Sequence, residues 1–288
     1  MTTVAHVPLP LPNRSIRAAL APVVSIGLLA ACAPSPDEVD SGRIHLSIGD
    51  SYAAGFRPAI GGEPAENVDD GFAWIVASQA GLTLESLACS GITAADYVDG
   101  QPCRDGARAP GMPDRDSGSE LDAVVDFLDD HGDDVELVTV ILGGNDVLPC
   151  AAEKDWRSCA EPAAERVQQA LDRLLEAIVA RVDHGVPVIG LTYPNILLAD
   201  GPRGRADAQP EASIALFGEV FNPALEQVYA KHGARFVDVT AAADGYRRSG
   251  KTQVCELTYY CDLGDVHPNE RGHERLAELV LDAREEIS

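Results

Sequence analysis

From about residue 43 onward, short apolar runs alternate with amphipathic stretches. A run such as VELVTVILGG (135–144) is apolar at nearly every position, which is typical of a strand buried on both faces of a parallel sheet. Strands are predicted at 43–49, 82–91, 135–144, 186–194 and 235–239. Helices are predicted between and after them, at 71–81, 119–132, 163–185, 213–233 and 268–287. This alternation predicts an α/β fold, a three-layer sandwich with a central, mostly parallel sheet.

Proline at position 223 lies inside the fourth predicted helix, so a kink or break is expected there. With 288 residues, 45% of them hydrophobic, the chain is long enough for one sizeable core, and a single large domain is expected. The 22 basic and 46 acidic residues give a net charge of −24, which argues against a nucleic-acid partner.

The first 32 residues differ in kind from the rest. Arg14 and Arg17 precede an uncharged apolar run (18–32) that is short for a membrane span and ends in small residues, which predicts a secretory signal. Its end, Leu29-Ala30-Ala31-Cys32, resembles a bacterial lipobox, whose cysteine is lipidated. The predicted division is a lipoprotein signal peptide at 1–31, a tether at 32–42 and a domain at 43–288. An ordinary signal and free secretion are the alternative to an anchor on the outer face of the cell membrane.

Six cysteines remain after Cys32, and an even number in an exported chain predicts disulfides. Six cysteines allow fifteen pairings. The pairs closest in sequence are the predicted bonds: Cys89–Cys103, Cys150–Cys159 and Cys255–Cys261. A zinc site is the weaker alternative, because no pair has knuckle spacing with histidines nearby. The acidic run 126–134 is interpreted as a solvated helix end, since it lacks the ligand register of a metal loop.

Three polar stretches fall where predicted strands end: Gly49-Asp50-Ser51, Cys89-Ser90-Gly91 and Gly143-Gly144-Asn145-Asp146. Parallel sheets bind ligands at this edge, so together these stretches indicate a site. Each also has an ordinary explanation. Ser51 could cap a helix that it opens, Asn145 could serve a turn, and Gly91 could permit a positive φ.

A serine nucleophile needs a base, and His267 is the candidate. It precedes Pro268, which is well placed to open the last helix. The other histidines have structural explanations: His6 lies in the signal, His45 in a strand and His273 in a helix, and His131, His184 and His232 each precede a glycine at a predicted helix end.

These residues resemble the motifs of the SGNH hydrolases, the GDSL-type lipases and esterases, and in particular their secreted bacterial branch with three disulfides. Four blocks occur in the family's order: Ser51 in GDSYAAG, Gly91 in CSGIT, Asn145 in GGNDV and His267 in DVHPN. The resemblance runs from about residue 43 to the C-terminus and implies the family's flavodoxin-like fold.

The resemblance implies that His267 accepts the proton of Ser51 as its oxygen attacks an ester carbonyl. The oxyanion hole would consist of the Ser51 and Gly91 backbone N–H groups and the Asn145 side chain. It implies a serine ester hydrolase that needs no cofactor or metal, acts on an ester or lipid and works as a monomer. The alternatives are a carbohydrate acetyl esterase of the same fold and a non-catalytic binding lipoprotein.

Two positions depart from the family pattern. Tyr52 stands where leucine usually follows the serine, and Gly264 stands where the family commonly has the aspartate that orients the histidine. Asp265, two residues before His267, is the tentative third catalytic residue. Side chains two apart in an extended segment lie about 6–7 Å apart, so Asp265 needs a turn to reach the ring. The Gly264 carbonyl is the alternative.

Overall fold

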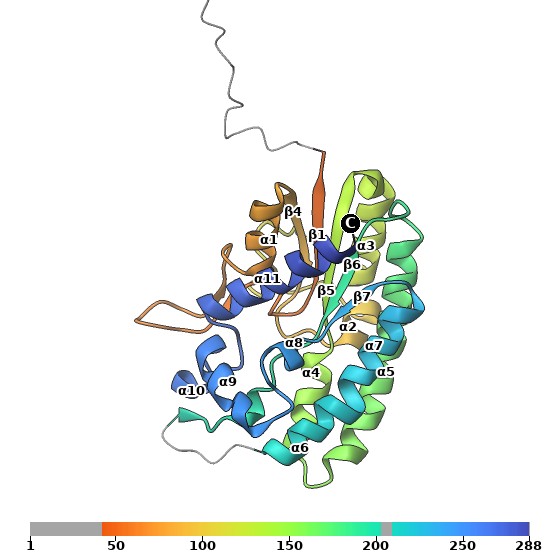
Figure 1. Cartoon of the computed structure of the whole chain (residues 1–288). Helices are drawn as coiled ribbons and strands as arrows, with labels where there is room; N and C mark the ends of the chain where they lie inside the picture. Colours follow the sequence, from red (N-terminus) through yellow and green to blue (C-terminus); the bar gives the residue numbers. More distant parts are fainter. Residues whose placement is uncertain (1–41, 203–208, 288) are drawn as a thin grey trace, which may run out of the picture. The chain divides into compact units, whose positions relative to one another are not determined.

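A five-stranded parallel sheet forms the centre of the fold (Figure 1). The computed structural model describes residues 42–202 and 209–287, so the predicted signal peptide, Cys32 and all of the tether except Gly42 lie outside the described residues. The strands are β1 (Ile44–Gly49), β4 (Thr83–Ala88), β5 (Val135–Ile141), β6 (Val188–Leu191) and β7 (Arg235–Val237). Their spatial order is β4-β1-β5-β6-β7.

The register makes the three strands on one side of the sheet end level. Gly49, the last residue of β1, pairs with Ala88 at the end of β4 and with Ile141 at the end of β5. The loops that follow these strands therefore leave the sheet side by side. The strand order also reverses between β1 and β5, which opens a crevice at this edge.

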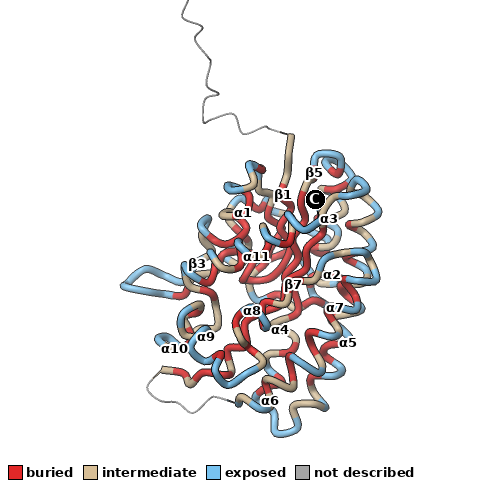
Figure 2. Tube along the Cα trace, viewed as in Figure 1, coloured by how far each residue is buried: buried red, intermediate tan, exposed pale blue. Residues whose placement is uncertain are grey.

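Helices cover both faces of the sheet, which confirms the three-layer α/β sandwich (Figure 1). On one face lie α1 (Phe72–Ala80) and α11 (Glu270–Ile287). On the other lie α2 (Ala94–Asp99), α3 (Glu120–His131), α5 (Trp156–Val179) and α7 (Asn222–Lys231). Figure 2 shows the sheet and the inward helix faces buried and the outward faces exposed, as the hydrophobic spacing predicts. None of the helices in the described residues is long and apolar enough to cross a membrane.

Several short elements lie near the carboxyl edge of the sheet. They are too short to show a periodic pattern of apolar residues, so the sequence did not predict them. They are the antiparallel pair β2 (Phe56–Arg57) and β3 (Glu66–Asn67), with α4 (Gly144–Val147), α6 (Pro210–Ala215), α8 (Val239–Ala242), α9 (Lys251–Leu257) and α10 (Tyr260–Leu263). Single 3₁₀ turns occur at Gly132–Asp134, Leu148–Ala152, Ile196–Leu198 and Arg248–Gly250.

Two helices differ from their predicted bounds. The helix expected at 163–185 begins earlier, at Trp156, and ends at Val179, with Pro162 inside it. The helix expected at 213–233 is divided as Pro223 predicts: α6 is followed by a π-helical turn, Leu216–Phe221, and Pro223 lies in the first turn of α7. Pro223 has no N–H to donate to the preceding turn. The wider π-helical turn accommodates this missing hydrogen bond.

The structure contains three disulfides, and they join the cysteines nearest in sequence: Cys89–Cys103, Cys150–Cys159 and Cys255–Cys261. The zinc alternative is therefore wrong for these six sulfurs. No group of three or more histidine, cysteine or acidic side chains within residues 42–202 and 209–287 is arranged to hold a metal ion.

Candidate active site

Ser51 follows β1 through a backbone that only glycine fits. Gly49 has φ +156°, and a Cβ there would lie 2.3 Å from the Ile141 carbonyl oxygen. Asp50 N–H donates to that same oxygen at 3.1 Å, so the chain turns sharply and brings Ser51 to the carboxyl edge. Residues 51–55 form hydrogen-bonded turns, so the expectation that Ser51 opens a helix is wrong. Its hydroxyl contacts the His267 ring.

Ser51, His267 and Asp265 lie in one hydrogen-bonded row. The Ser51 Oγ is 2.8 Å from His267 Nε2, and His267 Nδ1 is 2.7 Å from Asp265 Oδ1. Asp265 reaches the ring because the same carboxylate oxygen accepts the His267 backbone N–H at 3.0 Å, which folds its side chain over the next two residues. The sequence offered two groups to orient the His267 ring, the Asp265 carboxylate and the Gly264 carbonyl. The Asp265 carboxylate is the one that contacts the ring.

The electrostatics of Asp265 suit a carboxylate facing an imidazole. Partial burial acts to raise its pKa, but the hydrogen bonds from the His267 ring and backbone outweigh burial and hold the pKa below its usual value. Asp265 is therefore ionised at neutral pH and can stabilise a positive charge on His267.

Tyr52 connects the segment that carries Ser51 to the segment that carries His267. Its hydroxyl donates to the Val266 carbonyl oxygen at 2.7 Å, one residue before His267. The His267 carbonyl accepts from Tyr259 N–H at 3.0 Å, and the Phe56 ring packs 4.3 Å from the imidazole. The tyrosine that replaces the family's usual leucine thus makes a contact that leucine cannot make.

We expect Tyr52→Phe to lower kcat about fivefold with little change in KM, because the lost hydrogen bond to Val266 loosens the His267 ring relative to Ser51, a change of about 1 kcal/mol. Steady-state ester hydrolysis measures both constants. The matched control is Tyr97→Phe, which removes a buried tyrosine hydroxyl that donates to the Leu87 carbonyl at 2.6 Å, away from His267. Equal kcat losses in the two variants would contradict a positioning role for Tyr52.

Asn145 links the loops that follow β4 and β5. It lies in α4, and its side-chain Nδ2 donates one hydrogen to the Ile92 carbonyl oxygen at 2.9 Å. A side-chain amide carries a second N–H, which is the group an oxyanion requires. Gly91, beside Ile92, has φ +81°, and a Cβ there would meet no protein atom within 4 Å. Its backbone conformation, rather than crowding by the protein, is what favours glycine.

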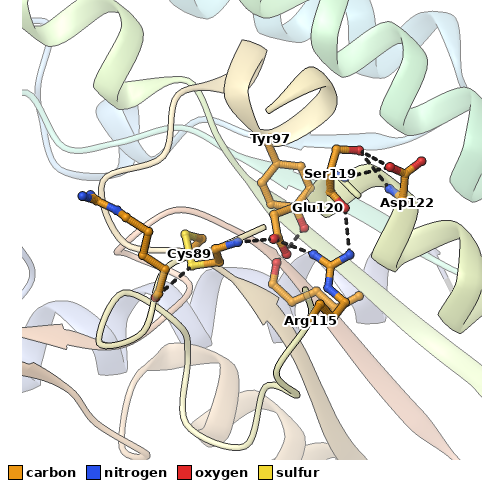
Figure 3. Close-up of polar contacts among 9 residues, drawn as sticks. Cys89, Tyr97, Arg115, Ser119, Glu120 and Asp122 are labelled. Carbon is orange, nitrogen blue, oxygen red and sulfur yellow. Dashed lines mark hydrogen bonds and ion pairs between the residues drawn. A yellow bond between two sulfur atoms is a disulfide. The ribbon is translucent and has the colours of Figure 1, made fainter. Parts of the chain in front are cut away.

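A buried ion pair anchors the loop that follows α2 and carries Cys103 (Figure 3). The Cys89–Cys103 disulfide ties the end of β4 to this loop. The fully buried Glu120 accepts the Cys103 backbone N–H at 2.7 Å and the Arg115 guanidinium at 2.5 Å. Sequence analysis predicted the disulfide but not the Arg115–Glu120 pair, because neither of these two residues belongs to a motif.

Asp50 is a second residue that sequence analysis missed, although it adjoins Ser51. Its side chain is buried, with Oδ1 accepting Tyr52 N–H at 3.0 Å and Oδ2 accepting the Tyr193 hydroxyl at 2.6 Å. Burial raises its pKa to about 6, although both hydrogen bonds oppose the rise. Because the folded pKa exceeds 3.8, the folded state holds this proton more tightly, and stability falls as the pH rises from about 4 to about 6.

The other described histidines lie away from Ser51. Burial lowers the pKa of His45 to about 3 and of His273 to about 4, so both are neutral. His131 ends α3 and His232 follows α7, as expected. His184 is different, since α5 ends at Val179 and His184 lies in the turn beyond it.

A serine, an imidazole and a carboxylate in hydrogen-bonded order, at the carboxyl edge of an α/β sheet, are the parts of a serine hydrolase. The family model of the GDSL-like lipase/acylhydrolase family matches residues 47–275, and the chain belongs to that family. It is a carboxylic ester hydrolase of the SGNH/GDSL type.

Known proteins that are similar to this chain include three lipases. "Lipase 2" of Streptomyces coelicolor is 26% identical over 318 residues, which cover 96% of this chain and 98% of that protein. An extracellular lipase from Streptomyces rimosus is 18% identical with a TM-score of 0.52, covering 84% and 99% of the two chains. The lipase Lip_vut3 from a goat rumen metagenome is 19% identical with a TM-score of 0.54, covering 84% and 97%. At these identities the two structures support the fold.

Proposed function

We propose that this protein is an exported serine esterase or lipase that uses Ser51 as nucleophile and His267 as general base and forms an acyl-enzyme. The observation that carries the proposal is the 2.8 Å contact between Ser51 Oγ and His267 Nε2, with Asp265 bonded to the opposite ring nitrogen. A nucleophile, base and orienting group in that order are what acyl transfer requires.

In the first half-reaction, Ser51 Oγ attacks the ester carbonyl while its proton passes to His267 Nε2. The carbonyl oxygen becomes an oxyanion, which the Ser51 and Gly91 backbone N–H groups and the Asn145 Nδ2–H group would stabilise. The imidazolium, held by Asp265, then protonates the departing alcohol, and the acyl group remains on Ser51. In the second half-reaction, His267 takes a proton from water as the water oxygen attacks the acyl carbonyl. The imidazolium then returns a proton to Ser51 Oγ as the acid leaves. No step requires a metal or cofactor.

Export and lipid anchoring are part of the proposal. Three disulfides are expected outside the cytoplasm, and a lipase of similar fold from Streptomyces rimosus is described as extracellular. The lipobox-like Leu29–Cys32 segment supports lipidation at Cys32 with cleavage after residue 31. We propose that 32–42 tethers a monomeric catalytic domain, 43–288, to the outer face of the cell membrane.

A fluorescent fluorophosphonate tests both parts in cells that express the full chain. We expect one covalent adduct, located on Ser51 by peptide mass spectrometry and absent from heat-denatured protein, because only an activated serine reacts quickly. A folded protein that takes up no label would contradict catalysis and favour the binding-lipoprotein alternative. Labelled protein is expected in the detergent phase after cloud-point separation. Recovery in the aqueous phase would contradict the lipid anchor while the esterase proposal stands.

A further inference from the structure

The loop between β4 and α2 carries Gly91, one of the proposed oxyanion donors. The residues on either side of Gly91 use their N–H groups within the protein: Ser90 donates to the Ala107 carbonyl at 2.7 Å, and Ile92 donates to the Cys89 carbonyl at 3.3 Å. The Gly91 N–H has no hydrogen-bond partner in the part of the chain that the structure describes. This donor is therefore available to a substrate, and its direction decides whether it can meet an oxyanion.

Two neighbouring side chains of α4 hold the far end of this loop. The Ile92 carbonyl oxygen accepts the Asn145 side-chain amide at 2.9 Å. The Ala94 backbone N–H donates to Asp146 Oδ2, also at 2.9 Å. The two loop residues are two positions apart, and the residues that hold them are adjacent, so the segment just after Gly91 is clamped to α4 at two points.

Close packing of the backbone fixes α4 itself. Gly143, which precedes it, has φ +110°, and a Cβ there would lie 2.7 Å from the Val167 side chain on α5. A Cβ at Gly144 would lie 2.8 Å from the Tyr193 ring. The Asp146 N–H donates to the Gly143 carbonyl at 3.2 Å. Because α4 is packed this closely on two sides, it is a firm support for the loop that Asp146 holds.

The Asp146 side chain is half-buried, and its charge strengthens the contact with the loop. Burial raises its pKa to about 6, while the Ala94 N–H and the charge of Arg166 act to lower it. The carboxylate is therefore ionised at neutral and slightly alkaline pH. A hydrogen bond to an ionised acceptor is stronger than one between neutral groups, so its loss should loosen the loop more than the loss of an ordinary bond.

We propose that Asp146 is a positioning residue for ester hydrolysis, which holds Ala94 and thereby fixes the direction of the Gly91 N–H toward the oxyanion. The proposal rests on the proposed function, since it assumes acyl transfer at Ser51 through this oxyanion hole. Asp146 makes no hydrogen bond to Ser51 and takes no proton in the reaction. A loosened loop weakens a contact that forms only in the transition state, so kcat should fall while KM stays the same.

The test compares Asp146→Ala with Asp146→Asn in the hydrolysis of a p-nitrophenyl ester. Asp146→Ala should lower kcat about thirtyfold with KM unchanged, which is part of the roughly hundredfold or greater loss that removal of an oxyanion donor itself causes. Asp146→Asn should stay within about fivefold of wild type, because its amide oxygen can still accept the Ala94 N–H.

An alkyl trifluoromethyl ketone separates positioning from a general loss of stability. The Ser51 oxygen bonds to the ketone carbon, the serine proton passes to His267, and the ketone oxygen becomes an oxyanion that the same donors hold. The inhibition constant of this ketone should therefore rise in Asp146→Ala by the factor by which kcat/KM falls.

The matched control is Thr93→Ala, at the same end of α2. The Thr93 hydroxyl accepts the Asp96 N–H at 3.1 Å and caps the helix, and its removal leaves the contact between Asp146 and Ala94 in place. Thr93→Ala should lower the unfolding temperature, since a lost cap destabilises a helix. Its kcat/KM and its inhibition constant for the ketone should stay within about threefold of wild type.

Two results would overturn the proposal: wild-type kcat in Asp146→Ala, or a fall in its kcat without a matching rise in the inhibition constant. Fluorophosphonate labelling of wild type separates this failure from failure of the proposed function. Labelled wild type with either result contradicts only the positioning role, whereas folded wild type that neither labels nor hydrolyses any ester contradicts the esterase itself. If Asp146→Ala does not fold, Asp146→Ser, which is polar but too short to reach Ala94, decides on the same expectations.

Discussion

Replacing Ser51 by alanine is expected to lower kcat about a million-fold, the loss seen when a serine hydrolase loses its nucleophile. In this protein the serine hydroxyl is 2.8 Å from His267 Nε2, and alanine leaves the imidazole nothing to activate. The fold should persist, because the substitution removes one hydrogen bond worth about 1 kcal/mol. The measurements are hydrolysis of a p-nitrophenyl ester and a thermal unfolding curve.

Ser90→Ala is the matched control for this variant. Ser90 lies at the same edge of the sheet, but its hydroxyl donates to Asn67 Oδ1 at 2.6 Å and contacts no histidine. Its loss should change kcat by less than about tenfold, the equivalent of one ordinary hydrogen bond. If Ser51→Ala and Ser90→Ala retained similar activity, the nucleophile would have to be another residue.

The second large effect is expected at Asp265. Asp265→Ala should lower kcat about ten-thousand-fold, because the imidazole loses both its orienting acceptor and the negative charge that stabilises its protonated form. Asp265→Asn should retain more activity than alanine. The His267 backbone N–H, 3.0 Å from Oδ1, would hold the amide oxygen toward the ring, so that chiefly the charge is lost. The kcat values of the two variants measure this difference.

Asp262→Ala is the control for the aspartate series, since Asp262 is an exposed residue of α10 five positions before His267. It should leave kcat close to wild type. Near-wild-type turnover in Asp265→Asn and Asp265→Ala together would show that the carboxylate is dispensable. The base would then be oriented by the backbone, as in the Gly264 alternative.

The hydrophobic pattern predicted the strands and large helices correctly because that pattern is local. A run such as 135–141 is apolar on both faces wherever it occurs in a parallel sheet. The hydrophobic pattern located the ends of helices less accurately than it located the helices themselves. Trp156–Val179 begins before Pro162, which the apolar stripe alone could not indicate, because packing against the sheet sustains a helix through an unfavourable residue. The short α9 and α10, which carry the loop to His267, have no periodicity to detect.

By itself, the sequence determined the order of the layers and the set of groups near the carboxyl edge. The apolar runs predicted strand ends at residues 49, 91 and 144, close to the observed ends at Gly49, Ala88 and Ile141. Parallel pairing then brings the loops with Ser51, Gly91 and Asn145 together. The disulfide partners also followed from sequence, because the bonded cysteines are close along the chain.

Only the tertiary structure decided which group contacts the His267 ring and what holds that ring beside Ser51. These depend on contacts between distant residues: Tyr52 with Val266, and Asp50 with Tyr193. Such contacts are set by side-chain rotamers and by turns with positive φ, and neither leaves a periodic trace in the sequence. The order of residues therefore specifies which candidate catalytic groups are present, and packing specifies their orientation.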